Sequence, residues 1–195
     1  MRRLFMAVAL PVLGLSSHAL LDGLIYENDF SQDPEDWYHD SIWEFGSDGA
    51  VVQTTEKFWD ATLFSGQPDD RLIFFVPDGA DSIGIVIPYT LEASVYEGSI
   101  LVEVRLGTDS GWEDIWFQYE QDDYISESDT ISCSPDYVQG GDWVGIFFAG
   151  FGNCDTWGSM DVLWQVHSIT ITAYGDSLYF EPASWAGIKA AGDSE

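Results

Sequence analysis

The stretch from Ser82 to Glu120, SIGIVIPYTLEASVYEGSILVEVRLGTDSGWEDIWFQYE, decides the fold. Apolar residues occupy every second position from Ile83 to Val95, and the alternation resumes from Ile100 to Leu106. A period of two is typical of a β-strand with one buried face. Short glycine-containing segments separate these two runs from each other and from a third run, 112–120. The stretch therefore predicts an antiparallel meander of three strands.

The rest of the chain shows further strand patterns and no amphipathic helix of normal length. Additional strands are predicted at 24–30, 42–45, 51–55, 58–64, 72–76, 130–133, 143–151 and 162–174. Two segments, the acidic 121–129 and the glycine-containing 152–161, are predicted to be loops. About ten strands without helices predict an all-β fold, a two-sheet antiparallel β-sandwich of jelly-roll type, in which the first and last strands commonly pair. This domain is expected over 20–180, followed by a C-terminal tail at 181–195.

The first 19 residues have the pattern of a secretory signal peptide. Arg2 and Arg3 precede an apolar run from Leu4 to Leu15, and small residues lie at Ser17 and Ala19. Cleavage after Ala19 would make the protein secreted, periplasmic or displayed on a cell surface. An uncleaved membrane anchor is the weaker alternative, because a bilayer-spanning helix needs about 20 apolar residues.

The charge of the chain limits the classes of partner. The sequence has 34 acidic and 6 basic residues, for a formal net charge of −28. Such a charge repels phosphate backbones, so nucleic acid is excluded as a partner, and anionic membrane surfaces are disfavoured. Cations, neutral glycans and a basic protein remain. The plainer interpretation is that a strongly acidic surface keeps an exported protein soluble, and a salty habitat would produce the same bias.

Two cysteines, Cys133 and Cys154, follow the signal segment. A disulfide between them is the default expectation for an exported chain. It would close a loop of about 20 residues and contribute about 3 kcal/mol in the chain-entropy model. Free thiols and a two-cysteine metal site are the alternatives, the second disfavoured because neither cysteine has a histidine near it in sequence.

The order of several short motifs resembles that of secreted jelly-roll modules, namely carbohydrate-binding modules and the MAM and laminin-G-like families of bacterial exoproteins. The motifs are Glu27 to Phe30, Pro34 to Trp37, Trp43 and, late in the chain, Trp164 to Ile169. The resemblance implies a β-sandwich and glycan binding. In many such relatives the last strand carries an aspartate that helps to hold a structural calcium ion together with acids of the first strand. His167 occupies that position here, which puts the calcium in doubt.

One face of the strand 112–120 is the candidate ligand-binding surface. Strict alternation places Trp112, Asp114, Trp116, Gln118 and Glu120 on the same side. An indole can cover the apolar face of a pyranose while carboxylates and amides bind its hydroxyl groups. The competing interpretation is that Trp116 packs under a loop or against the second sheet, as large aromatics mostly do.

Other candidates lie in the expected loops, because loops at one end of a sandwich commonly form binding sites. Tyr124 and Trp157 are the aromatic candidates, although each alone fits a plug over the core equally well. Calcium would need six to eight oxygen ligands. The candidate ligands are Glu27 and Asp29 from the first strand, or the cluster of the acidic segment, Asp122, Asp123, Glu127 and Asp129. With so many acids, a solvated surface explains any one cluster.

Catalytic motifs find little support in the sequence. The Glu-x-Asp-x-x-Glu motif of jelly-roll glucanases is absent, and so are a nucleophile elbow and a phosphate-binding loop. Paired carboxylates for glycoside hydrolysis are defined by a separation that only a structure gives. The sequence therefore predicts a secreted, non-catalytic β-sandwich that binds polysaccharide. The alternative is a structural or adhesive surface protein that binds cations or a protein partner, and a glycoside hydrolase ranks third.

Overall fold

The computed structural model describes residues 23–34, 36–65 and 74–175, which form eleven β-strands and no helix. Among these residues no helix has the length and apolar character needed to cross a membrane. The predicted signal peptide at 1–19, the predicted tail at 181–195 and the first two residues of the predicted strand at 72–76 lie outside the described residues. The strands are β1 (Leu24–Asn28), β2 (Tyr38–His39), β3 (Trp43–Gly46), β4 (Gly49–Thr54), β5 (Phe58–Phe64), β6 (Phe74–Phe75), β7 (Ser82–Thr108), β8 (Gly111–Gln121), β9 (Tyr124–Cys133), β10 (Trp143–Val166) and β11 (Ile169–Tyr174).

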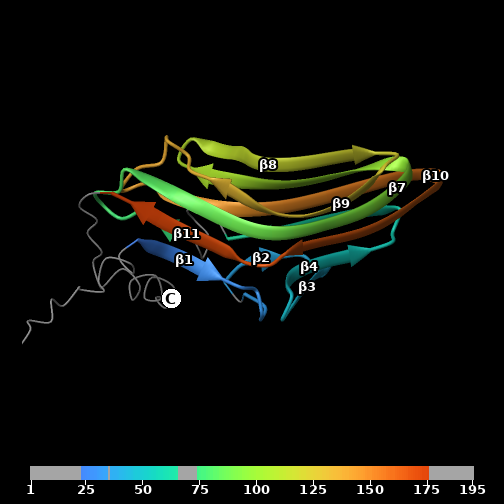
Figure 1. Cartoon of the computed structure of the whole chain (residues 1–195), viewed down its shortest axis with the longest axis horizontal. Coiled ribbons are helices and arrows are strands. Elements are labelled where there is room, and N and C mark those ends of the chain that lie inside the picture. The colour runs from blue at the N-terminus through green and yellow to red at the C-terminus, as the bar shows by residue number, and fades with distance from the viewer. Residues whose placement is uncertain (1–22, 35, 66–73, 176–195) are drawn as a thin grey trace, which may run out of the picture.

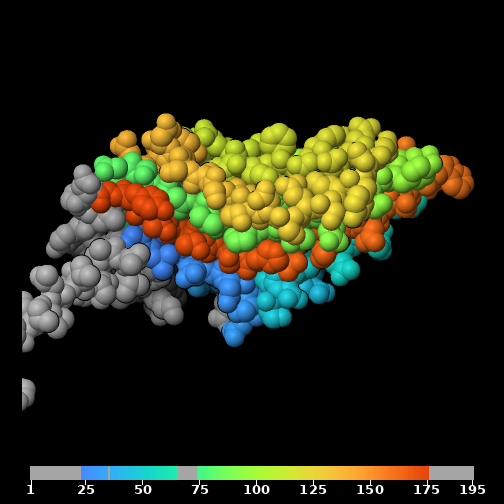
Figure 2. All heavy atoms as spheres, viewed as in Figure 1, coloured from blue at the N-terminus to red at the C-terminus, as the bar shows by residue number. Residues whose placement is uncertain are grey.

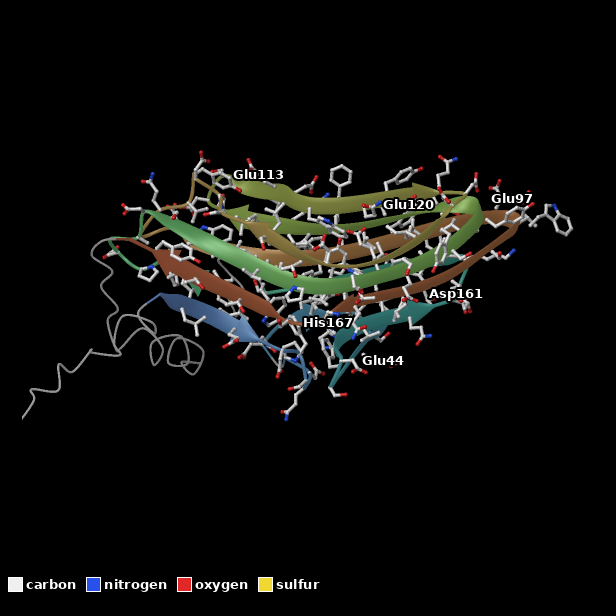
Figure 3. The ribbon with its side chains drawn as sticks, in the orientation of Figure 1. Glu44, Glu97, Glu113, Glu120, Asp161 and His167 are labelled. Atoms are coloured by element: carbon white, nitrogen blue, oxygen red, sulfur yellow. The ribbon has the colours of Figure 1, made fainter. Side chains whose placement is uncertain are left out.

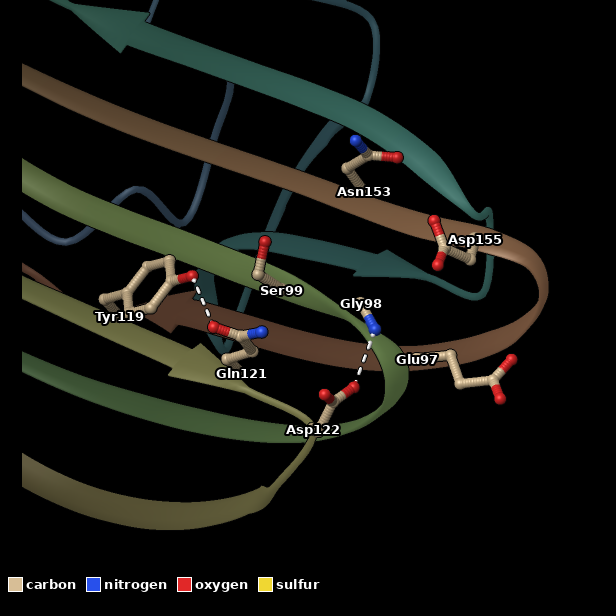
Figure 4. Close-up of a pocket in the computed structure, with 8 residues that line it drawn as sticks. All are labelled: Glu97, Gly98, Ser99, Tyr119, Gln121, Asp122, Asn153 and Asp155. Atoms are coloured by element: carbon tan, nitrogen blue, oxygen red, sulfur yellow. Dashed lines mark hydrogen bonds between the residues drawn. The ribbon is translucent and has the colours of Figure 1, made fainter.

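The two longest strands, β7 and β10, form the centre of the fold. They pair with each other antiparallel along most of their length, with a register shift between Cys154 and Ser159. At this point both ribbons turn back on themselves, at the right of Figure 1 and in the close-up of Figure 4. Glu97 makes the turn in β7 with a left-handed φ of 51°. The Gly98 N–H stabilises it by donating to the carboxylate of Asp122, over 2.9 Å.

Because β7 and β10 turn back together, their strand pairing continues through two sheets. In sheet I, the first half of β7 pairs with β9 on one side and, on the other, with the second half of β10 and with β11. Beyond these, β4 pairs with β10, β1 pairs with β11, and β3 pairs with β4 at the edge of the sheet. Sheet II contains β8, the second half of β7, the first half of β10, β5 and β2. All of these pairs are antiparallel. The first and last described strands, β1 and β11, pair as predicted.

The inward side chains of the two sheets form one core. Every second residue from Ile83 to Val95 is buried, and the buried set changes phase to begin at Ile100 after the turn. Contacts cross between the sheets: the Trp59 indole N–H of β5 donates to the sulfur of Met160 in β10, over 2.9 Å. The rings of Phe148 and Trp164, one in each half of β10, lie 6.4 Å apart. The predicted β-sandwich is therefore confirmed.

Part of the predicted topology was wrong. The runs 83–95 and 100–106 are not neighbours in a meander, because the turn at Glu97 places them in opposite sheets. Most of the predicted loop 121–129 belongs to strand β9, and the predicted loop 152–161 is the middle of β10. The alternation of β9 is hard to recognise because its inward positions include Glu127 and Asp129 and its outward positions carry serine.

The predicted disulfide is also wrong, since both cysteines are free thiols. Cys133 pairs with Ile85 and Cys154 pairs with Gly98, both on β7. At about 3.3 Å per residue these partners lie roughly 40 Å apart along the strand, whereas a disulfide joins Cα atoms about 4.4–6.8 Å apart. Of the residues between the cysteines, 134–142 connect the two strands, and 143–153 belong to the extended strand β10, which carries Cys154 away from Cys133. Burial raises the pKa of both thiols.

Candidate functional site

The outer sides of the two sheets differ in their chemistry. Figure 2 shows the outer side of sheet I, formed by β9, β7, β11 and β1. Hydroxyl side chains are common on it, and they bond to their neighbours: Thr90 lies 2.8 Å from the Ser128 hydroxyl and 3.0 Å from the Nε2 atom of His167. The outer side of sheet II carries aromatic side chains instead. The outer side of sheet II is therefore the candidate binding surface.

Four aromatic rings form a continuous line across sheet II, which we call the aromatic row: Trp112, Phe147, Phe64 and Tyr38. They come from β8, β10, β5 and β2, so the row runs across the strands. Successive ring centroids are 5.7, 6.0 and 5.1 Å apart. Tyr38 is 59% exposed, and the other three rings are half-buried.

Trp112 joins the row because its strand neighbour has no side chain. Trp112 pairs with Gly107 of β7, and Gly107 pairs with Gly145 of β10. A Cβ atom at Gly107 would lie 2.9 Å from the indole ring. The indole therefore lies over Gly107 and extends toward Phe147 across a strand that would otherwise separate the two rings.

Further aromatic side chains extend this surface toward the turned-back end of the sheet. Phe58 of β5 and Phe151 of β10 contact each other with centroids 5.6 Å apart. Phe117 and Tyr119 of β8 are 62% and 52% exposed. They pair with outward positions of β7 and so lie on the same side of sheet II as the aromatic row. Large exposed apolar surfaces of this kind commonly mark binding sites.

A cluster of three charged side chains lies beside the aromatic row. Arg105 donates through Nε to the carboxylate of Asp114 at 2.8 Å and through a terminal nitrogen to Glu103 at 3.0 Å. Its guanidinium carbon lies 5.9 Å from the centre of the Phe147 ring, within cation–π range. Glu103 is buried, whereas Arg105 and Asp114 are partly exposed. The cluster therefore presents an oriented set of donors and acceptors next to the rings.

A shallow depression of about 350 Å³ lies at the turned-back end of sheet II (Figure 4). Tyr119 and Gln121 of β8 form one side of it, with the Tyr119 hydroxyl donating to the Gln121 side-chain oxygen at 3.2 Å. Polar and acidic side chains form the rest of the lining: Glu97, Ser99, Asp122, Asn153 and Asp155, with the backbone of Gly98. The depression thus adds hydrogen-bonding groups at one end of the aromatic surface.

The predicted pairing of Trp112 and Trp116 on one face is wrong. The register of β8 against β7 shifts, because Asp114 pairs with Arg105 while Trp116 pairs with Val104. The extra residue in β8 is a β-bulge, and it reverses the direction of the side chains that follow. Trp112 and Asp114 therefore face outward, and Trp116 and Gln118 face the opposite side.

Trp116 packs against the core, which is the alternative that the sequence left open. Its ring lies 4.8 Å from that of Tyr89, a buried residue of sheet I. The Tyr89 hydroxyl donates to Glu127 of β9 at 2.6 Å, and burial together with this carboxylate raises the pKa of Tyr89. Gln118, also on the inward side, bonds to Glu120 of its own strand. Of the predicted platform, Trp112 and Asp114 lie on the outer side, and Trp116, Gln118 and Glu120 lie on the inward side.

The two aromatics predicted from the loops lie away from the aromatic row. Tyr124 begins β9 in sheet I and pairs with Ser94. Trp157 is 85% exposed at the turn of β10, within the register shift. Both belong to the turned-back end of the molecule, and neither is close in register to any ring of the row.

The predicted calcium ligands are divided between distant parts of the fold. Glu27 pairs with Thr170 on β11, and the Asp29 carboxylate accepts the Ser31 N–H at 2.9 Å. Asp122 belongs to the turn beside Gly98, with Asp123 next to it. Within the described residues, no group of three or more His, Cys, Asp or Glu side chains is arranged to hold a metal ion.

Acidic side chains are spread over the molecule, as Figure 3 illustrates. Glu97 and Glu113 lie at opposite ends, and Glu44 is on the side of the molecule away from Glu113. His167, at the position where the resembled families carry an aspartate, contacts the hydroxyl of Thr90. This dispersion supports the interpretation that the acidic side chains form a solvated surface.

Sequence reasoning missed three rings of the aromatic row, Tyr38, Phe64 and Phe147, and it missed Arg105. Phe147 lies in a run that is apolar on both faces, which favoured a fully buried strand. A usable signal was present, because Phe58 and Phe64 alternate with the buried Trp59, Ala61 and Leu63. Aromatic residues at the outward positions of a strand indicate a surface that contacts something other than water.

Comparison with known proteins finds similarity in structure alone. No family model and no curated protein sequence matches the chain. Among solved structures, the chain is similar to the carbohydrate-binding module TmCBM61 in complex with β-1,4-galactotriose (TM-score 0.41, 10% identity, 75% of this chain and 91% of that one). It is also similar to the N-terminal cellulose-binding domain of Cellulomonas fimi β-1,4-glucanase C (0.34, 12%, 81% and 98%) and to the CBM22-1 xylan-binding domain of Paenibacillus barcinonensis Xyn10C (0.31, 10%, 79% and 96%).

These neighbours are of the kind that the sequence resemblance predicted. TM-scores below 0.5 and identities near 10% are too low to carry binding residues from one chain to another. The fold assignment therefore rests on the strand pairing described above, and the site rests on the aromatic row and the charged cluster of this chain.

Proposed function

We propose that this protein is a non-catalytic carbohydrate-binding module that binds an extended polysaccharide along the aromatic row. The observation that carries the proposal is the unbroken line of four rings, Trp112, Phe147, Phe64 and Tyr38, on the outer side of sheet II. Aromatic rings stack on the apolar faces of sugars, and flanking polar groups fix orientation. The solved structures named above, a module in complex with galactotriose, a cellulose-binding domain and a xylan-binding domain, agree with this proposal.

The direction of the row suits a linear ligand. Neighbouring strands are about 4.8 Å apart, and the neighbours β10, β5 and β2 place their rings at intervals of 6.0 and 5.1 Å. Trp112 reaches over Gly107 of β7 and continues the line with a spacing of 5.7 Å from Phe147. A chain of sugar rings lying across the strands would meet one aromatic ring after another. Arg105 and Asp114 at the β8 end would then bind hydroxyl groups along one edge of that chain.

The acidic character of the molecule agrees with such a ligand. A net charge of −28 repels polyanions, whereas stacking and hydrogen bonding to an uncharged sugar are unaffected by it. If the predicted signal peptide is cleaved, the domain would meet polysaccharide outside the cytoplasm.

The test is affinity electrophoresis of the domain through gels that contain soluble glucan, galactan, xylan or mannan. We expect retardation by at least one of them. The informative variant removes both ends of the row, Tyr38→Ala with Trp112→Ala. The matched control is Tyr124→Ala with Trp157→Ala, which removes the same two residue types from exposed positions outside the row.

The row variant should migrate as it does in a gel without polysaccharide, and the control should be retarded like the wild type. Thermal unfolding of each variant shows whether the fold is intact. If no polysaccharide retards the wild type, the proposal is refuted, and the aromatic surface becomes a candidate interface with a protein partner. If the control loses binding and the row variant keeps it, the site has been placed on the wrong sheet.

A further inference from the structure

Arg105 is a positive charge in the middle of a surface that otherwise carries negative charge. Among the described residues of β8, β7, β10 and β5 that are paired within sheet II, the outward charged side chains are Arg105 and three carboxylates, Glu103, Asp114 and Asp60. A guanidinium beside stacking rings would ordinarily attract a carboxylate of a ligand, because arginine binds carboxylates by charge-assisted hydrogen bonds.

In this chain the carboxylates that Arg105 binds are its own. Asp114 occupies the Nε–H at 2.8 Å, and Glu103 lies 3.0 Å from a terminal nitrogen with either of its oxygens. Glu103 is 9% exposed, so its charge is held in a partly desolvated position against the guanidinium. Arg105 has five N–H donors, and those not used by Glu103 and Asp114 remain to meet neutral acceptors such as hydroxyl groups.

We infer that the Glu103–Arg105–Asp114 cluster makes the site selective for uncharged polysaccharide over polyuronate, with Asp114 as the residue that sets this selectivity. The inference rests on the proposed function of the aromatic row. Asp114 balances the charge of Arg105 and fills the Nε–H, where a ligand carboxylate would otherwise bind. A uronate would have to displace Asp114 and leave it unpaired, whereas a hydroxyl group needs no displacement.

The experiment compares one polysaccharide backbone in two charge states. The probes are the neutral hexose polymer that binds the wild type best and the same polymer after oxidation of its primary hydroxyl groups to carboxylates. Binding is measured by affinity electrophoresis at low and at physiological salt, because exposed charges are screened over about 8–10 Å near physiological ionic strength. The informative variant is Asp114→Asn, which keeps the side-chain shape and removes the charge.

The matched control is Asp60→Asn, which changes the net charge by the same amount on the same side of sheet II. Asp60 pairs with Phe151 at an exposed position of β5 and has no bond to Arg105. We expect the wild type and Asp60→Asn to bind the neutral polymer and reject the oxidised one. In Asp114→Asn, the ratio of the affinity for the oxidised polymer to the affinity for the neutral polymer should rise by about tenfold over the wild-type ratio, equivalent to about 1.4 kcal/mol.

Three other outcomes test the selectivity, the role of Asp114 and the proposed function separately. If the wild type binds the oxidised polymer as well as the neutral one, the selectivity inference is wrong while the proposed function stands. Equal gains in Asp114→Asn and Asp60→Asn would show that net charge, rather than the bond to Arg105, excludes uronates, and this too overturns the role of Asp114. Failure of the wild type to bind any neutral polymer would refute the proposed function itself.

Discussion

Replacing Gly107 by alanine should weaken polysaccharide binding without destabilising the fold. The added Cβ atom would lie 2.9 Å from two atoms of the Trp112 ring. Ordinary carbon–carbon contacts are about 3.5–4.0 Å, so the indole must move away by roughly 0.6–1 Å or rotate. It would then stand higher over the sheet than the Phe147 ring, whose centroid is 5.7 Å away and whose plane is tilted by 58° in the wild type. A ligand that lies against both rings would lose one of these contacts.

The magnitude follows from the loss of one stacking contact. Aromatic contacts contribute about 0.5–1.5 kcal/mol beyond the area they bury, so about 1 kcal/mol corresponds to roughly a fivefold increase in Kd. Stability should change in the opposite direction or stay constant, because glycine within a strand costs about 0.5–1 kcal/mol relative to alanine. That gain offsets the packing lost when Trp112 moves.

The assay is isothermal titration of the wild type and variants with the best oligosaccharide, together with urea unfolding. Gly46→Ala is the matched control, because Gly46 also lies in a strand and an added Cβ atom there meets no other atom within 4 Å. The control should bind like the wild type. Unchanged affinity in Gly107→Ala would refute the argument that Trp112 must lie over Gly107 to bind the ligand.

Three further predictions concern stability. Trp164→Ala should lower the free energy of unfolding by about 3–5 kcal/mol in urea titrations, since Trp164 is fully buried against Trp43 and Phe148; a loss below about 1 kcal/mol would contradict the described core. Thiol titration of the unfolded protein should give two free thiols, and reductant should leave the unfolding midpoint unchanged, because a disulfide worth about 3 kcal/mol would instead be lost on reduction. Burial, assisted by Asp60, raises the pKa of the Asp40 carboxyl, although the Thr62 N–H opposes this shift. A raised folded-state pKa means that stability from this group is lost as pH rises through the ordinary aspartate value to the folded value. The stability of Asp40→Asn relative to the wild type should therefore be greater near pH 7 than near pH 3, and a constant difference across this range would show that Asp40 does not titrate as described.

The sequence determined the fold class because the signal for it is local. A period of two, as in Ile83 to Val95, reports which side of a strand is buried without reference to its neighbours. The pairing of the first and last strands followed from the sandwich architecture. The outward positions of β5 could likewise have been recognised, because Phe58 and Phe64 alternate with buried residues.

The tertiary structure alone decided which residues meet. The turn at Glu97 moves the chain from one sheet to the other, so the successive segments 83–95 and 100–106 of β7 face each other across the core. One extra residue in β8 places Trp112 and Trp116 on opposite sides of the sheet, and the alternation of residues in the sequence does not reveal such a bulge. Long antiparallel pairing places Cys133 near the start of β7 and Cys154 at the turn in the middle of β7. The aromatic row has the same origin: its members come from four strands, and only strand register brings Trp112, Phe147, Phe64 and Tyr38 into line.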